Sequence, residues 1–380
     1  LALDPADVIL LDHDGRLTDM RLVSIADSDL RSVDAVRQDR AVYDLPPGER
    51  RPTTLSTPTV FGAPEILLLD LPQLREDQPA HRPFVAAHAK PWPGEIAVYR
   101  SAATDGFSLL TTFGTRARMG VLAADFHSGP VARFDLGNAL LVDLYSGTLE
   151  SVTDLALLGG ANALAVETSP GLWEIVQAGA AELVAAGRYA LTRLLRGQRG
   201  TESAIANVVP AGARVVVLDT ALTSLPINEA DLGLPWNWRI GPASKPVSDE
   251  TYTAVVLTPE GVGLRPFPVG HVEQPWRFAR SPGDLTIRWV RRSRSLAADT
   301  WGAGDVPLAE DAEAYEVDIL DGSVVKRSLT TATTSALYTA TQQTADWGAP
   351  LGPGQFLALR IYQLSALIGR GAGRSVTLTF

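Results

Sequence analysis

The sequence predicts a mainly β protein built from several segments, and three observations support this. Short apolar runs recur along the 380 residues, and Gly, Asp and Ser turns separate most of them. Hydrophobic residues make up 46% of the chain and charged residues 20%, which is typical of a folded protein. Proline-rich stretches interrupt the pattern twice, so we expect segments 1–62, 63–272 and 273–380.

The first segment, 1–62, predicts a small β-sheet or barrel. The run Val8–Leu11 is followed by a turn at Asp12–Gly15 and by Met20–Ile25, whose alternation fits a strand with one buried face. The chain begins abruptly in this pattern, so we expect it to be part of a longer polypeptide.

The central segment, 63–272, predicts an all-β domain. Helix formers at 180–186 lie between Gly179 and Gly187, which excludes a long helix. We expect the proline-containing stretches 72–93 and 226–248 to be loops, and 252–257 to pair with 262–264. The expected strands are Ile66–Leu69, Ile96–Tyr99, Phe107–Leu110, Ala139–Val142, Trp173–Val176 and Ala213–Asp219.

The stretch Arg188–Glu202, which we call the joint, combines leucines, arginines and two glycines. Its leucines at 191, 194 and 195 fit one face of a short helical turn, and Gly197 and Gly200 can adopt positive φ. An arginine fork can bind carboxylates or phosphates. We expect Arg193, Arg196 and Arg199 to pair with acidic groups such as Glu202 or with carbonyls, rather than to line a nucleic-acid path.

The last segment, 273–380, predicts about seven antiparallel strands, as in a β-sandwich. Trp289 alternates with Arg288, so we expect its indole in the core near Tyr315 or Ile361, with Arg288 on the opposite face. The expected strands include Leu285–Trp289, Tyr315–Leu320, Val324–Leu329, Phe356–Tyr362 and Ser375–Leu378.

Catalytic and metal-binding patterns are not found in the sequence. Cysteine is absent, the five histidines are scattered, and neither a Gly-x-Ser-x-Gly nor a phosphate-binding loop occurs. We therefore predict no catalytic residue, metal or cofactor. The formal charge of −10 disfavours nucleic-acid binding.

Three clusters leave an alternative open. The carboxylates at 310, 311 and 313 could act as a hydrolytic pair, but a solvated turn is the simpler interpretation. The basic run 288–294 fits a solvent-exposed or subunit-contact face. Trp236 and Trp238 could stack on a sugar ring or anchor a loop.

Three stretches carry a family resemblance. Pro5–Ile9 with Arg21–Ile25 resembles a strand pair of phage tail hubs, and the joint resembles a Leu-Leu-Arg-Gly-x-Arg-Gly-Thr-Glu signature of the neighbouring domain. Residues 287–320 resemble the Trp-x-x-Arg-x-Arg…Tyr-x-Val-x-Ile sequence of the C-terminal module, which looks similar to fibronectin type III. Over nearly its whole length the chain resembles the C-terminal part of the baseplate hub (megatron) proteins of gene transfer agents and the related siphophage tail-tip host-specificity proteins.

This resemblance implies a structural role at the tail tip of a phage-like particle made in the bacterial cytoplasm. It implies a homotrimeric hub that contacts distal-tail and other tail-tip proteins, touches the cell envelope and gates DNA delivery. Arg193, Arg196, Arg199, Glu202, Trp289 and Tyr315 are the structural or interface candidates. The alternative is a carbohydrate-binding receptor module, and an envelope-degrading enzyme is a third hypothesis.

Overall fold

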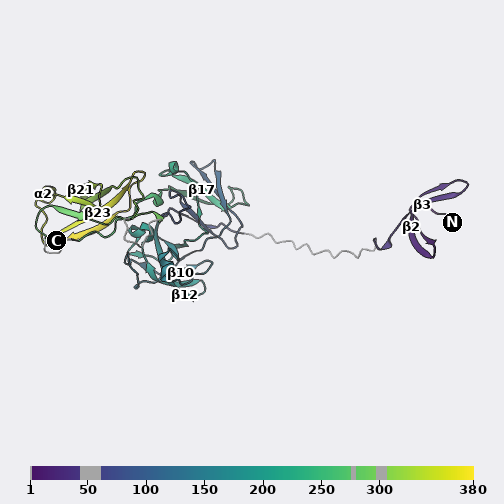
Figure 1. Ribbon diagram of the computed structural model, residues 1–380, viewed down its shortest axis with the longest axis horizontal. Helices are drawn as coiled ribbons and strands as arrows, with labels where there is room; N and C mark the ends of the chain where they lie inside the picture. The colour runs from purple at the N-terminus through teal and green to yellow at the C-terminus, as the bar shows by residue number, and fades with distance from the viewer. Residues whose placement is uncertain (1, 43–60, 275–279, 297–305) are drawn as a thin grey trace. The chain divides into compact units, whose positions relative to one another are not determined.

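The computed structural model describes residues 2–42, 61–274, 280–296 and 306–380, and these residues are mainly β (Figure 1). This confirms the predicted fold class. The chain divides into two compact units, Leu1–Thr59 and Val60–Phe380, which we call the N-terminal and C-terminal units and describe separately. The domain limits expected at 62 and 272 stay predictions.

The N-terminal unit is a three-stranded antiparallel sheet. Its strands are β1 (Val8–His13), β2 (Arg16–Asp27) and β3 (Arg31–Arg37), followed by a short 3₁₀ turn, η1 (Arg40–Val42). Among the described residues of this unit only Leu22 is buried. Within 20–25, Leu22 is buried and Met20 and Ile25 are half-buried, whereas the other three residues are exposed, so the expected buried face is found only in part.

A closed six-stranded barrel lies at the centre of the C-terminal unit, with the strand order β10-β13-β12-β11-β15-β8. Side chains along each strand point alternately into and out of the barrel, and the inward set fills its interior. Val142, Leu164, Val176 and Leu191 are among these buried residues. The barrel strands are β8 (Met119–Leu122), β10 (Leu140–Leu144), β11 (Ala163–Ser169), β12 (Leu172–Ala185), β13 (Arg188–Leu195) and β15 (Arg214–Val217).

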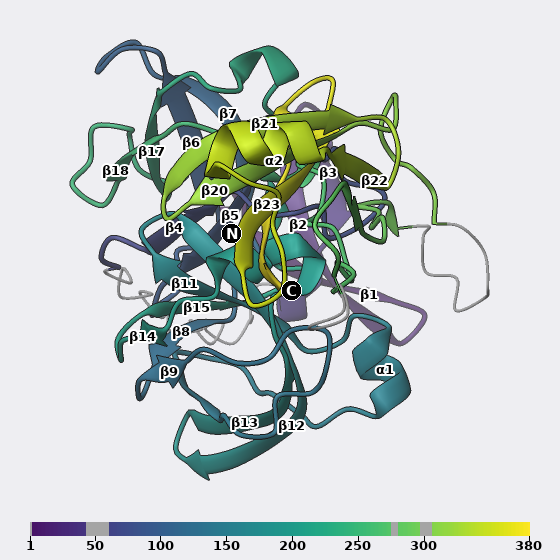
Figure 2. The ribbon, with the colours of Figure 1, turned by 90° about the vertical axis from the view of Figure 1, so that its left-hand side faces the viewer.

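Shorter elements connect the barrel strands. The two-residue strands β9 (Phe126–His127) and β14 (Val208–Val209) pair with each other, and the helix α1 (Asp154–Leu158) precedes β11. Thr153 caps α1 by accepting a hydrogen bond from the backbone N–H of Ala156. Figure 2 shows α1 near the β12–β13 hairpin, which extends from one end of the barrel.

Two further sheets cover the barrel in layers. The middle sheet has the order β16-β5-β4 and the outer sheet has the order β18-β17-β6-β7. Phe84 and Ala86 of β5 pack toward the barrel, whereas Val85 and Ala87 pack toward the outer sheet. The strands are β4 (Glu65–Leu69), β5 (Phe84–His88), β6 (Ile96–Ser101), β7 (Ser108–Phe113), β16 (Thr223–Ser224), β17 (Trp236–Pro242) and β18 (Thr253–Leu257).

Both proline-containing stretches that we expected to be loops contain strands. β5 lies inside 72–93, and β17 lies inside 226–248 beside the 3₁₀ turn η3 (Glu229–Asp231). The prolines flank β5, and β17 ends at Pro242, so they do not interrupt the central ladder. Trp238 of β17 is a fully buried core residue. The ring of the nearby Trp236 is instead in contact with the Arg100 guanidinium, which stacks on it.

Two local predictions in the central segment are also wrong, whereas the exclusion of a long helix at 180–186 is confirmed. Residues 262–264 form a 3₁₀ turn, η4 (Val262–Leu264), and β18 pairs with β17 instead. The helix formers at 180–185 belong to β12, and the joint leucines belong to β13. Closure of the barrel requires both strands, so tertiary pairing overrides the weak helical preference of alanine and leucine.

The C-terminal residues form a β-sandwich with seven described strands. One sheet pairs β19 with β22, and the other has the order β21-β20-β23, with β24 and β25 also paired to β23. A capping box at Thr339 and Gln342 begins an unpredicted helix, α2 (Ala340–Trp347). The strands are β19 (Leu285–Arg288), β20 (Tyr315–Asp321), β21 (Val324–Thr331), β22 (Ser335–Tyr338), β23 (Phe356–Ser365), β24 (Gly369–Arg370) and β25 (Arg374–Thr379).

Trp289 lies in the sandwich core, on the predicted face. Its side chain is 4% exposed, and its ring meets the Tyr315 ring edge-on, with centroids 5.2 Å apart. Ile361 belongs to the same cluster. Arg288 points away, and its side chain is 60% exposed beside Glu273. The alternation read from the sequence therefore assigns the two faces correctly.

Trp289→Ala should destabilise the sandwich far more than Arg288→Ala. The first change removes a buried aromatic ring and leaves a cavity, which costs about 3–5 kcal/mol. The second removes an exposed ion pair and should cost less than about 1 kcal/mol. Urea unfolding of the full chain, followed by circular dichroism, measures both values. Equal midpoints for the two variants would contradict this assignment of faces.

Candidate functional site: the buried arginine joint

The joint begins with the barrel strand β13, and after this strand the chain turns sharply into a 3₁₀ segment, η2 (Gln198–Ala204). Gly197 has φ 58° and Gly200 has φ 81°, as the glycine pattern predicted. A side chain at Gly197 would collide with Glu202, and one at Gly200 would collide with Phe267. The two glycines therefore allow this turn to pack closely against its neighbours.

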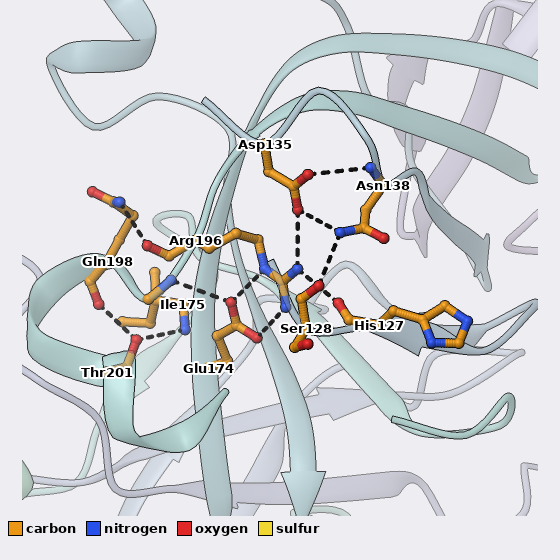
Figure 3. A network of polar contacts seen from close by, with 10 residues as sticks. His127, Ser128, Asp135, Asn138, Glu174, Ile175, Arg196, Gln198 and Thr201 are labelled. Atoms are coloured by element: carbon orange, nitrogen blue, oxygen red, sulfur yellow. Dashed lines mark hydrogen bonds and ion pairs between the residues drawn. The ribbon is translucent and has the colours of Figure 1, made fainter. Parts of the chain in front are cut away.

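Arg196 is the centre of a buried polar network (Figure 3). Its Nε and Nη2 atoms donate to the two carboxylate oxygens of Glu174 at 2.7 and 2.9 Å, which is a bidentate pair. The Arg196 and Glu174 side chains are both 0% exposed. Glu174 shares the inward face of β12 with Val176 and Ala178. The ion pair is thus built into one end of the barrel interior.

Asp135 is the second buried carboxylate of this network. Arg196 Nη1 donates to Asp135 Oδ2 at 3.2 Å and to the carbonyl of His127 at 2.8 Å. Two buried carboxylates share one arginine, so further donors are needed. The backbone N–H groups of Gly137 and Asn138 and the Asn138 amide donate to Asp135. Burial raises the pKa of Asp135, but these bonds outweigh it, and the pKa lies below its usual value.

The network also fixes the turn that follows Arg196. The Gln198 amide donates to the Arg196 carbonyl at 3.0 Å, and the Thr201 hydroxyl donates to the Gln198 carbonyl at 2.7 Å. The same hydroxyl accepts from the backbone N–H of Ile175 in β12 at 2.9 Å. Arg196 also lies over the Phe126 ring at 4.0 Å. Strand, turn and loop are therefore held by one continuous set of contacts.

The joint residues named from the sequence fall in different environments. Arg193 pairs with Asp154 at 2.6 Å on the surface, and Arg196 forms the buried network. Arg199 lines a cavity beside the barrel. Glu202 binds Arg292, which lies outside the joint. Arg193 and Arg196 form the expected ion pairs, while a subunit-interface role for these residues stays a prediction.

Two arginines of the basic run 288–294 pair with two carboxylates of the acidic cluster 310–313. Arg291 pairs with Glu313 at 2.9 Å, and Arg294 pairs with Glu310 at 2.6 Å. The Glu310 side chain is only 3% exposed, so describing it as part of a solvated turn was wrong. The fold brings the two oppositely charged stretches together, which gives both a structural function.

Sequence reasoning missed Glu174, Asp135 and Gly129, which complete the site. Glu174 could have been noticed in the sequence, because it is the one charged residue in the apolar run 173–176. In the structure it lies at an inward-facing position of β12. Asp135 and Gly129 lie in an irregular segment whose path the sequence does not specify. In the part of the chain that the structure describes, no group of His, Asp and Glu residues is arranged to hold a metal ion.

One family model matches the barrel region of the chain. The family model described as "Rcc01698-like, C-terminal" matches residues 117–216, a range that runs from just before β8 into β15 and includes the joint. This family name is associated with gene transfer agents, and the match is compatible with the resemblance found in the sequence.

The other comparisons add little. No curated protein matches the chain. Among solved structures, the glycoside hydrolase domain of Endo-D from Streptococcus pneumoniae R6 aligns with 12% identity and a TM-score of 0.19. The alignment covers 69% of this chain and 32% of that structure. A likeness at this level has no bearing on fold or catalysis, so the absence of enzymatic activity stays a prediction.

Arg196→Ala should destabilise the barrel strongly. The substitution leaves Glu174 and Asp135 buried without their cation, which typically costs about 3–5 kcal/mol. Arg193→Ala is the matched control, because it breaks a partly exposed pair and should cost less than about 1 kcal/mol. Guanidinium unfolding of both variants tests this. Similar stabilities would mean that the network contributes no more than a surface pair.

Gly129→Ala should disturb the same network without removing any charge. A methyl group there would overlap the Asp135 carboxylate and crowd Arg196 Nη1. Such overpacking costs about 1–3 kcal/mol. At Gly137 the nearest atom to an added methyl group lies 3.9 Å away, so Gly137→Ala serves as the control and should be nearly neutral. Differential scanning calorimetry compares them, and an unchanged melting temperature for Gly129→Ala would contradict the packing described.

Proposed function

We propose that this chain is a structural subunit of the tail tip of a phage-like particle, a baseplate hub protein of the gene transfer agent type. It assembles as a homotrimer with distal-tail and other tail-tip proteins, contacts the cell envelope and gates DNA delivery. The observation that supports this most directly is the match of the "Rcc01698-like, C-terminal" family model to the barrel and joint.

The character of the barrel site fits a structural role. The Arg196 guanidinium and its two carboxylates are engaged with one another and with backbone groups, and the residues involved are buried. Such a network holds strands and loops in one arrangement. A site for acid–base chemistry needs instead a group that a substrate can reach. The geometry therefore supports a rigid building block.

The N-terminal unit supports assembly. It exposes large apolar side chains on all three strands, including Leu10 at 58%, Leu17 at 61% and Val36 at 58%. A three-stranded sheet with one buried residue does not bury enough apolar surface to be stable alone. Contacts with other subunits of a hub would cover this surface.

The charge pattern supports protein partners over nucleic acid. The arginines at 193, 196, 291, 292 and 294 each pair with a carboxylate, so they are not a set of free cations for phosphates. DNA passing through a hub of this kind would meet an acidic protein with a formal charge of −10 per chain. Weak adhesion to the channel wall favours passage.

Sedimentation of the chain together with the particle's distal-tail and tail-tip proteins tests this proposal. We expect a complex with three copies of this chain, and we expect Leu10→Glu to prevent its formation by placing a charge on the apolar sheet. Val256→Glu is the control, since Val256 is 68% exposed on β18 of the C-terminal unit. A wild-type chain that remains a compact monomer and binds none of these proteins would refute the hub assignment.

A further inference from the structure

A cavity of about 260 Å³ lies against the outside of the barrel, beside the joint. Its walls come from the proline-rich loop before β5, from β12, from the start of η2 and from the segment that follows β15. The polar residues on these walls are Arg75, Gln78, Gln177, Gln198, Arg199, Asp219 and Thr220. Leu74, Ile175, Leu218 and Leu222 supply an aliphatic floor.

Two of the wall amides are fixed by the fold. Gln177 is 6% exposed, and its Nε2 atom donates to the carbonyls of Leu157 and Ala161 at 2.7 and 2.9 Å. Both N–H groups are thereby used, which leaves the carbonyl oxygen to accept from a ligand. Gln198 gives one N–H to the Arg196 carbonyl and keeps the other. These two amides can therefore offer one acceptor and one donor to a ligand in this cavity.

Two of the charged wall residues, Asp219 and Arg75, have ion-pair partners. Asp219 accepts from Arg118 at 2.7 Å and from the backbone N–H of Ala221 at 2.8 Å, and Arg75 pairs with Asp77 at 3.2 Å. A charged ligand would have to compete with these pairs. A neutral ligand that offers several hydroxyl groups can instead bond to amides, carboxylate and guanidinium without breaking them.

The size and the floor of the cavity restrict the ligand further. A volume of 260 Å³ corresponds to roughly nine water molecules at about 30 Å³ each. This space suits one sugar ring, whose C–H face would lie on the aliphatic floor. We propose that this cavity binds a single neutral sugar residue of a glycan.

The lining also sets the expected strength of binding. None of the described residues that line the cavity is aromatic, so the ring gains no stacking interaction. We expect dissociation constants on the order of 1 mM for monosaccharides. Several copies of the chain on one particle would raise this affinity by multivalency. That increase rests on the proposed hub, whereas the site itself does not.

Saturation-transfer NMR on the full chain tests the site with the methyl glycosides of glucose, galactose, mannose and N-acetylglucosamine, and with glucuronic acid as a charged probe. We expect at least one neutral sugar to give saturation transfer and the charged probe to give none. Thr220 is exposed on the rim, so Thr220→Trp should obstruct the mouth and weaken binding by about tenfold or more. Thr112→Trp, on exposed β7, is the matched control and should bind normally.

Three results would overturn the proposal: no response to any neutral sugar, a response to glucuronic acid alone, or equal binding by the wild type and Thr220→Trp. Sedimentation of Thr220→Trp with the tail proteins separates this proposal from the hub assignment. A variant that loses sugar binding and still assembles supports both. A wild type that binds sugar through this cavity but does not assemble supports the sugar site and refutes the hub.

Discussion

The barrel of the C-terminal unit depends on the burial of Arg196 between two carboxylates. Glu174 comes from β12, Arg196 follows β13, and Asp135 comes from an irregular segment that is bridged to Leu194. A buried ion pair is expensive to desolvate, so such a group is stable only when every partner is in place. The network therefore favours one arrangement of the strands and the loop, and it penalises arrangements in which any of the three is displaced.

The same constraint explains the shape of the joint. Arg196 must point into the barrel end while the chain reverses, which requires the left-handed backbone at Gly197 and Gly200. Gly197 also donates its N–H to Glu174 at 3.2 Å. Beyond the turn, Glu202 reaches Arg292 of the following module. A single stretch thus closes the barrel, turns the chain and contacts the C-terminal sandwich residues.

Strands were predicted well from the sequence where one face of the strand is buried and the other is exposed to solvent. Trp289 and Arg288 show this, because alternation alone separates core from surface. The prediction failed for β5, which lies between two layers, and for β17 of the outer sheet; both strands lie next to prolines. A strand buried on both faces has no alternation, and a propensity argument then gives too much weight to the neighbouring prolines.

The candidate site was predicted only in part, for a physical reason. In a chain with more acidic than basic residues, the sequence predicts that an arginine pairs with a carboxylate. Which carboxylate it binds depends on how the strands pair. Glu202 is close to Arg196 in sequence, yet Glu174 binds it, because β12 and β13 are neighbours in the barrel. The acceptor of a buried arginine is a long-range property of the register, which one sequence does not reveal.

The pairing of arginines with carboxylates also bears on how this chain would recognise other molecules. Once Arg196, Arg291 and Arg294 are bound to their carboxylates, they add little to long-range steering. Recognition then rests on shape, on apolar surface such as the exposed side chains of the N-terminal sheet, and on neutral polar groups such as the amides of Gln177 and Gln198. Association by these means changes little with salt. Under the two proposals made above, such a chain would assemble and bind a neutral glycan while an anionic polymer moves past it.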